Sequence, residues 1–213
     1  SGSVSLSTTK KFGDYSYRFI GSGTSNGGYV SIPTMNDDFS DGFTLTCWVN
    51  FSSFESYSRI FESLQSNTEN RIILFVNGTN NSLTFLTNYN TTNKSITIPN
   101  ILSTSTWYFI VVQISNIGYA RIFINNHLYV NGLISPIQTL SRSINNIGKS
   151  NTGNDYFNGY IQDLRIYNYF LDEYEINNIH NNLNGTYSDK INVWEKIDDL
   201  TPNEHICIDF NSN

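Results

Sequence analysis

Short runs of Val, Ile, Phe, Tyr and Thr recur along the chain, and clusters of Asn, Gly, Ser and Pro separate them. Runs of β-branched and aromatic residues between turn-forming clusters predict a series of short β-strands. No helical segments alternate with these runs, which argues against a βαβ architecture and favours an all-β sandwich. The predicted strands cover residues 15–20, 28–33, 43–51, 58–63, 71–77, 82–88, 94–98, 106–115, 119–125, 127–131, 144–149 and 158–168.

A tight turn is predicted at Asn125-Asn126, which separates the run RIFI from the run HLYV. Asparagine tolerates positive φ, and a pair of such residues between two strand-like runs is typical of a two-residue hairpin. We therefore expect residues 119–131 to form a β-hairpin.

One segment near the end of the chain has helical periodicity. Asp172 can cap its first turn, and Glu175, three positions later, completes a capping box. The apolar face and the C-terminal stop are predicted from Ile176, Ile179, Leu183 and Gly185. We expect a short amphipathic helix with a structural role, laid on a sheet edge or loop.

The charge of the chain argues against a nucleic-acid partner. The 213 residues include 12 Lys plus Arg and 18 Asp plus Glu, for a net charge of −6, and the basic residues form no cluster. A phosphate backbone is bound by a basic patch, so no nucleic acid is expected as a partner. No run approaches the about 18 apolar residues that span a bilayer, so no membrane insertion is expected. The opening Ser1-Gly2-Ser3 is typical of a cloning remnant rather than of a signal peptide.

The two cysteines, Cys47 and Cys207, are too far apart for a CxxC motif and too few for a disulfide scaffold. Cys47 alternates with Phe43, Leu45 and Val49, which favours a buried apolar thiol. A bridge to Cys207 is the alternative, and the redox compartment stays open.

Taken in order, these runs resemble the laminin-G-like domains of the concanavalin A-like lectin/glucanase superfamily. The segments FTLTCWVN (43–50), WYFIVVQIS (107–115) and NNIGKS (145–150) are weak matches that fall in the right order. The most specific segment, FNGYIQDLRIYNYFLDEYEINNI (157–179), is similar to the closing strand of the family and the helix after it. The resemblance implies a two-sheet antiparallel jelly-roll β-sandwich with one short C-terminal amphipathic helix.

This resemblance covers about residues 15–183 and suggests three segments. Residues 1–14 are expected to be a tag remnant and N-terminal lead-in, and residues 15–185 the laminin-G-like jelly-roll domain. Residues 186–213, with the strand-like run HICIDF, are expected to form a C-terminal extension that packs on the sandwich. No linker or internal repeat divides the chain.

The superfamily mixes lectins, carbohydrate-binding modules, adhesion domains and glycosidases, so the fold does not fix the activity. Its laminarinase-type glycosidases carry a Glu-x-Asp-x-Glu strand, whose alternation places two carboxylates on one face about 5 Å apart. No such motif occurs in this sequence, and none of its three histidines has a plausible Ser, Cys or Asp partner nearby in sequence. We expect no enzymatic activity.

Calcium is the one cofactor that the resemblance implies. In many relatives a structural calcium lies where the acidic residue of the final strand meets carbonyls of the first strand, and Asp163 is the matching position. Gln162 replaces the first Asp of the family's pair, which removes one carboxylate. The alternative is that Asp163 pairs with Arg165 or Arg121. A second acidic loop, Asp37-Asp38 with Asp41, is predicted to be a solvated turn, with calcium as the alternative.

Sugar recognition needs an aromatic ring for the apolar face of the sugar and planar polar groups for its hydroxyls. Three predicted loops supply both: SSFESYS (52–58), TNYNTTN (87–93) and NTGNDYF (151–157). The candidate ligand-binding residues are Tyr57, Tyr89, Asn154, Asp155 and Tyr156, in turns that can cluster at one rim. Trp48 and Trp107 lie inside strand patterns and are expected to be core residues.

The sequence therefore predicts a non-catalytic recognition or adhesion module, lectin-like, on a secreted, cell-surface or virion-surface protein. Its expected partner is a glycan or a surface protein. A structural or protein-interaction domain, such as a coat or fibre component, is one alternative, and an exposed edge strand would favour it. An accessory domain of a larger glycosidase is the other.

Overall fold

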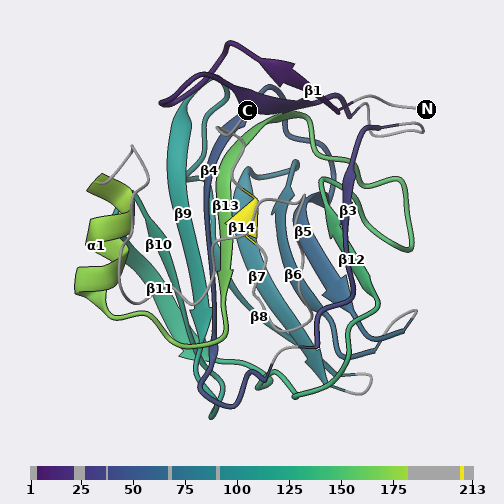
Figure 1. Cartoon of the computed structure of the whole chain (residues 1–213), viewed down its shortest axis with the longest axis vertical. Helices are drawn as coiled ribbons and strands as arrows, with labels where there is room; N and C mark the ends of the chain where they lie inside the picture. The colour runs from purple at the N-terminus through teal and green to yellow at the C-terminus, as the bar shows by residue number, and fades with distance from the viewer. Residues whose placement is uncertain are drawn as a thin grey trace.

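The chain folds into two antiparallel β-sheets and one helix (Figure 1). The computed structural model describes residues 4–21, 27–36, 38–66, 69–89, 92–181 and 207–208. In strand order, sheet A consists of β1 (Val4–Ser7), β2 (Ser16–Phe19), β13 (Gly159–Tyr167), β4 (Phe43–Phe51), β9 (Trp107–Ile114), β10 (Tyr119–Ile124) and β11 (His127–Leu133). A two-residue strand, β14 (Cys207–Ile208), also pairs with β13.

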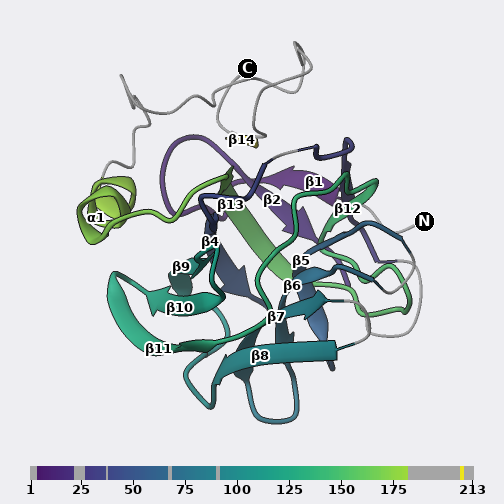
Figure 2. The same cartoon turned by 90° about the horizontal axis from the view of Figure 1, so that it is seen from below.

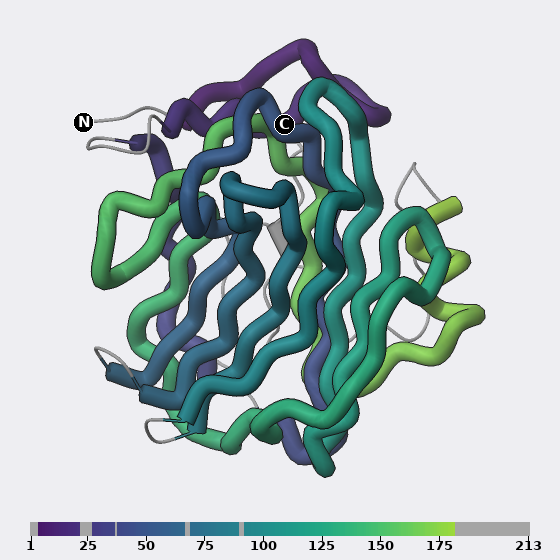
Figure 3. The backbone as a smooth tube through the Cα atoms, turned by 180° about the vertical axis from the view of Figure 1, so that it is seen from behind, coloured from purple at the N-terminus to yellow at the C-terminus, as the bar shows by residue number. Residues whose placement is uncertain are grey.

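Sheet B packs against one face of sheet A and contains six strands (Figure 3). In strand order these are β3 (Val30–Ile32), β12 (Ile144–Ile147), β5 (Ser58–Leu64), β6 (Ile72–Asn77), β7 (Ser82–Tyr89) and β8 (Thr92–Ile98). Each of the twelve predicted strands is present, and the predicted two-sheet jelly-roll sandwich is confirmed. Strand β1 was not predicted, although the structure places it at an edge of sheet A.

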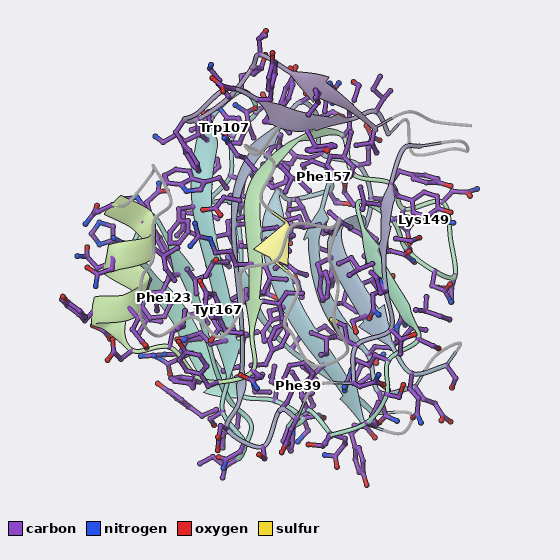
Figure 4. All side chains as sticks on the ribbon, viewed as in Figure 1. Phe39, Trp107, Phe123, Lys149, Phe157 and Tyr167 are labelled. Atoms are coloured by element: carbon purple, nitrogen blue, oxygen red, sulfur yellow. The ribbon has the colours of Figure 1, made fainter. Side chains whose placement is uncertain are left out.

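Aromatic and aliphatic side chains fill the space between the sheets. Phe43 of β4 stacks on Phe85 of β7 across this space, with ring centroids 6.4 Å apart, and Phe39 meets Phe43 edge to face at 5.4 Å. Figure 4 shows Phe39 and Phe157 at the two ends of this core. Cys47 is a free, fully buried thiol, as favoured by its alternation with apolar residues. Burial raises the pKa of this thiol, which keeps it protonated.

The predicted hairpin is confirmed. Strands β10 and β11 pair in antiparallel fashion from Ile124↔His127 to Tyr119↔Leu133. Asn125 and Asn126 both have positive φ, 50° and 67°, which is the requirement of a two-residue turn that matches the strand twist.

Helix α1 (Glu173–Asn181) begins with the predicted capping box. The backbone N–H of Glu175 donates to Asp172 Oδ1 at 2.8 Å, and that of Asp172 donates to Glu175 Oε2 at 2.8 Å. Ile176 and Ile179 are buried, whereas the predicted Leu183 and Gly185 lie outside the described residues.

The helix covers the outer face of sheet A, the face turned away from sheet B (Figure 2). It does not lie on a sheet edge or loop as expected, because a second apolar cluster is available on that face. This cluster consists of Trp48, Phe109, Val111, Phe123, Tyr167, Leu171, Ile176 and Ile179. His180 stacks on Trp48 with ring centroids 5.3 Å apart, which fixes the last described turn.

Removing the cap should loosen this helix. We expect Asp172→Ala to lower the free energy of unfolding by about 1 kcal/mol, because the N–H of Glu175 loses its acceptor. Asp172→Asn is the matched control, since an amide oxygen still caps, and should cost about half as much or less. Urea unfolding followed by tryptophan fluorescence measures both variants. Equal losses would show that the charge of Asp172, not its capping bond, stabilises the helix.

Candidate functional site

A β-bulge in β5 brings two charged residues onto the same face of sheet B. Arg59 pairs with Phe75 and Phe61 with Leu74, so Ile60 is the extra residue. Residues three apart on a regular strand point to opposite faces, and the bulge removes this alternation. Arg59 and Glu62 therefore both lie on the outer face of sheet B, while Ile60 and Phe61 join the core.

Glu62 is the centre of a buried ion cluster. Its Oε2 accepts from Nε of Arg59 at 3.3 Å, and its Oε1 accepts from Nη2 of Arg71 at 2.5 Å. The backbone N–H of Asn151 also donates to Oε2 at 3.1 Å, although the side chain of Glu62 has no exposed surface. Burial lowers the pKa of the Arg59 guanidinium, and the carboxylates of Glu62 and Asp155 oppose that shift. The cluster thus holds a fixed guanidinium at the edge of the surface.

Two of the three predicted loops meet beside this cluster. Nη2 of Arg59 lies 3.7 Å from Oδ2 of Asp155, and the Ser58 hydroxyl donates to the backbone oxygen of Tyr156 at 3.0 Å. Tyr57 has φ 53° and is 50 % exposed, and its ring contacts Phe75 with centroids 5.7 Å apart. The Asp155 carboxylate is 30 % exposed. An exposed aromatic ring and a partly exposed carboxylate therefore flank Arg59.

The other predicted site residues differ in position. Asn154 is exposed in the same loop as Asp155, whereas Tyr156 is only 8 % exposed and so offers almost no ring surface. Tyr89 is 46 % exposed but lies at the opposite end of sheet B. Strands β6 and β7 pair from Asn77↔Ser82 at one end to Ile72↔Thr87 at the other. Tyr57 lies at the first of these ends, because the next residue, Ser58, pairs with Val76, whereas Tyr89 lies beyond Thr87 at the second. The three loops therefore do not share one rim.

The sequence did not identify Arg59, Glu62 or Arg71 as site residues. The available signal was the presence of charged residues in the otherwise apolar run RIFES (59–63). Regular alternation assigns Arg59 and Glu62 to opposite faces, so only the bulge reveals that they form one cluster.

Asp163 lies in a bulge of β13. Two residues of β13 oppose one residue of β4 between the pairs Gln162↔Trp48 and Arg165↔Thr46. Asp163 is 4 % exposed with φ 52°, and its two oxygens accept from Nε and Nη2 of Arg165 at 2.5 and 2.9 Å. The structure therefore shows the pairing with Arg165 that was the alternative to calcium.

Calcium at Asp163 stays a prediction, and the observed donors do not fit it. Both carboxylate oxygens already face a cation, and the described residues contain no group of three or more His, Cys, Asp or Glu side chains able to hold a metal ion. Gln162 instead binds the N-terminal segment: its Nε2 donates to the carbonyls of Phe12 and Tyr15 at 2.8 and 3.1 Å. A neutral amide therefore satisfies carbonyl oxygens at this position without a metal.

In the second acidic loop, the side chain of Asp38 accepts two hydrogen bonds. Oδ1 of Asp38 accepts from the backbone N–H of Ser40 at 2.9 Å and from the hydroxyl of Thr139 at 2.8 Å. The hydrogen bond from Ser40 is the largest cause of a lowered Asp38 pKa, because both bonds favour the charged form. Asp37 lies outside the described residues.

A family model described as the concanavalin A-like lectin/glucanases superfamily, of the laminin G type, matches residues 23–177. The chain belongs to this superfamily. Its sequence matches no curated protein. No helix among the described residues is long and apolar enough to cross a membrane.

Solved structures with the same fold include a binding domain of a botulinum neurotoxin and a domain of an arabinanase. The binding domain of botulinum neurotoxin DC in complex with SialylT is 19% identical, with a TM-score of 0.65 over 90% of this chain and 46% of that one. The same domain in complex with rat synaptotagmin II is 20% identical, with a TM-score of 0.66 over 90% and 46%. Domain 4 of AbnA, a GH43 extracellular arabinanase from Geobacillus stearothermophilus, in complex with arabinotriose, is 16% identical, with a TM-score of 0.67 over 84% and 82%. The chain spans less than half the length of the toxin domains.

Neutralising the central carboxylate should destabilise the sandwich. We expect Glu62→Gln to lower the free energy of unfolding by about 3 kcal/mol, because the guanidinium groups of Arg59 and Arg71 lose their buried counter-charge. Glu69→Gln is the control at an exposed position and should change stability by less than about 0.5 kcal/mol. Chemical unfolding of the three proteins at one pH compares them. A loss below about 1 kcal/mol for Glu62→Gln would show that the cluster is not required for folding.

Proposed function

We propose that the domain is a non-catalytic glycan-binding module. The observation that carries this proposal is the exposed ring of Tyr57 beside the partly exposed carboxylate of Asp155, with Arg59 fixed between them. An aromatic ring can cover the apolar face of a sugar. A carboxylate accepts hydrogen bonds from the sugar hydroxyls, and an amide can both accept from them and donate to them. Asn154, exposed in the same loop, supplies the amide.

The comparisons support a binding module in general terms. One solved structure with this fold is bound to arabinotriose, and another is a toxin binding domain in complex with SialylT. The arabinanase whose domain has this fold is extracellular, and we also propose an extracellular or surface location for this domain. No catalytic role is proposed, because the sequence lacks the Glu-x-Asp-x-Glu strand of the laminarinase-type glycosidases and the fully buried Glu62 carboxylate cannot contact a substrate.

A glycan array, run in calcium and in EGTA, tests this function. We expect the wild-type domain to bind a defined subset of saccharides, and Tyr57→Ala to weaken binding at this rim at least tenfold through loss of the stacking ring. Tyr89→Ala is the matched control, since Tyr89 has a similar exposure at the opposite end of sheet B. A blank array in both conditions would overturn the glycan proposal. Equal losses for both tyrosines would exclude this rim as the site.

A second candidate function is protein recognition through self-assembly. Strand β11 pairs only with β10 among the described strands, so its other edge has no hydrogen-bonded strand partner there, although β11 also approaches β8 of sheet B. Leu128, Tyr129 and Leu133 are 43, 47 and 72 % exposed on this strand. An open edge with exposed apolar side chains is a template for strand addition. A second copy could add its own β11 in antiparallel fashion across a two-fold axis.

Sedimentation over a range of protein concentrations tests this candidate. Self-assembly through β11 predicts a dimer that Leu133→Lys returns to monomer, because the lysine repels its symmetry mate and loses apolar contact. Ile117→Lys, a change at a 76 % exposed loop residue, is the control and should leave the dimer intact. A wild-type monomer at 100-fold the concentration used for glycan binding would exclude the candidate.

A further inference from the structure

Four residues form a direct cross-strand row on sheet A. Arg18 of β2 pairs with Tyr160 of β13, Tyr160 pairs with Asn50 of β4, and Asn50 pairs with Trp107 of β9. Directly paired residues project from the same face of a sheet. The row therefore presents a guanidinium, a phenol, an amide and an indole side by side, and we call it the sheet A shelf.

The shelf lies on the outer face of sheet A. Trp48, two residues from Asn50 on β4, belongs to the apolar cluster under helix α1, so Asn50 projects on the same side. Figure 4 shows Trp107 at the end of β9 that is away from α1, whereas Phe123 lies against the helix. The N-terminal segment covers the neighbouring row, where Gln162 holds the backbone of Phe12 and Tyr15. The shelf is the next row of the outer face, which neither helix α1 nor the N-terminal segment covers.

The aromatic part of the shelf is partly open and held in place. Trp107 and Tyr160 are half-buried, with ring centroids 6.4 Å apart. The Arg18 guanidinium lies over the Tyr160 ring at 4.9 Å. Its Nη1 donates to the side chain of Asn158 and to the backbone oxygens of Phe19 and Gly159, whereas its Nε and Nη2 have no hydrogen-bond partner among the described residues. These free donors sit beside a fixed pair of rings.

Asn50 is the observation that points to a ligand. The residue is only 5 % exposed, yet its side-chain amide forms no hydrogen bond within the part of the chain that the structure describes. Its amide atoms keep a small contact with solvent, because they are absent from the fully buried polar atoms without a partner. A buried amide without a partner is unfavourable unless something polar reaches it from outside. In the row, Asn50 lies between Tyr160 and Trp107, and a sugar hydroxyl that reaches its amide could both donate and accept a hydrogen bond.

Two cations without a counter-charge define the chemistry of the ligand. Neither Arg18 nor Lys11 forms an ion pair with any described residue, although acidic residues outnumber basic ones in the chain. The ammonium of Lys11 lies over the Trp48 ring at 4.7 Å, next to the shelf. By contrast, the buried arginines Arg59 and Arg165 each face a carboxylate.

We propose that the sheet A shelf binds a pyranose that carries a carboxylate, with its ring on Trp107 and Tyr160, a hydroxyl on Asn50 and its carboxylate at Arg18. This inference rests on the proposed glycan-binding function and adds a second site, on the other sheet from Tyr57. Trp107 was expected to be a core residue, and the shelf gives it a role at the surface.

Isothermal titration with matched acidic and neutral saccharides tests the shelf. The acidic probes are 3′-sialyllactose and trigalacturonate, and their neutral counterparts are lactose and α-1,4-galactotriose. We expect at least one acidic probe to bind at least tenfold more tightly than its neutral counterpart. Asn50→Ala and Trp107→Ala should each weaken that binding at least fivefold, and Arg18→Gln should abolish the preference for the acidic probe. Circular dichroism and thermal unfolding confirm that each variant is folded, and Arg18→Lys, which keeps the charge, should retain part of the preference.

Tyr57→Ala separates the two sites. If Tyr57→Ala removes saccharide binding while the three shelf variants bind like the wild type, the glycan function stands and the shelf inference is overturned. The inference is also overturned if the neutral probes bind as tightly as the acidic ones. If the wild type binds no saccharide here or on the array, both the shelf and the glycan function fall.

Discussion

Burial of the central strands of sheet A on both faces is the constraint on which the other features depend. All nine residues of β4 are buried, so alternate side chains need cover from sheet B on one side and from other segments on the opposite side. Helix α1 covers the rings of Trp48 and Phe109, and Gln162 ties the N-terminal segment over the next part of the outer face. The shelf is partly open because neither cover extends over it. The position of a surface site thus follows from how the outer face of a buried sheet is covered.

The sequence predicted those features that a few neighbouring residues determine. The twelve strands follow from local runs of β-branched and aromatic residues, the hairpin from two asparagines, and the helix start from Asp172 and Glu175. Strand β1 was missed because four residues, two of them serine, give too weak a pattern. The placement of α1 was wrong because the apolar cluster beneath it comes from four strands that are distant in sequence.

The candidate sites depend on register and could not be predicted in the same way. Arg59 and Glu62 share a face only because Ile60 forms a bulge, and a bulge leaves no clear trace in one sequence. Tyr57 and Tyr89 are equally plausible loop tyrosines until the β6–β7 pairing assigns them to opposite ends of sheet B. The shelf joins residues 18, 50, 107 and 160 through three separate strand pairings. Each pairing must be known before their side chains can be placed on one face.

The distribution of charge decides how such a site would work in a chain with net charge −6. The buried carboxylates of Glu62 and Asp163 are neutralised by arginines inside the fold, whereas Arg18 and Lys11 remain unpaired among the described residues. At physiological salt the Debye length is about 8 Å, so the distant negative charges are largely screened from a ligand at the shelf. For an acidic ligand in contact with the shelf, attraction to Arg18 and Lys11 therefore exceeds repulsion from the net negative charge of the chain. An acidic sugar bound there would gain affinity from direct contacts with fixed groups and little from long-range attraction, and added salt would weaken its binding only in proportion to the one or two charges it meets.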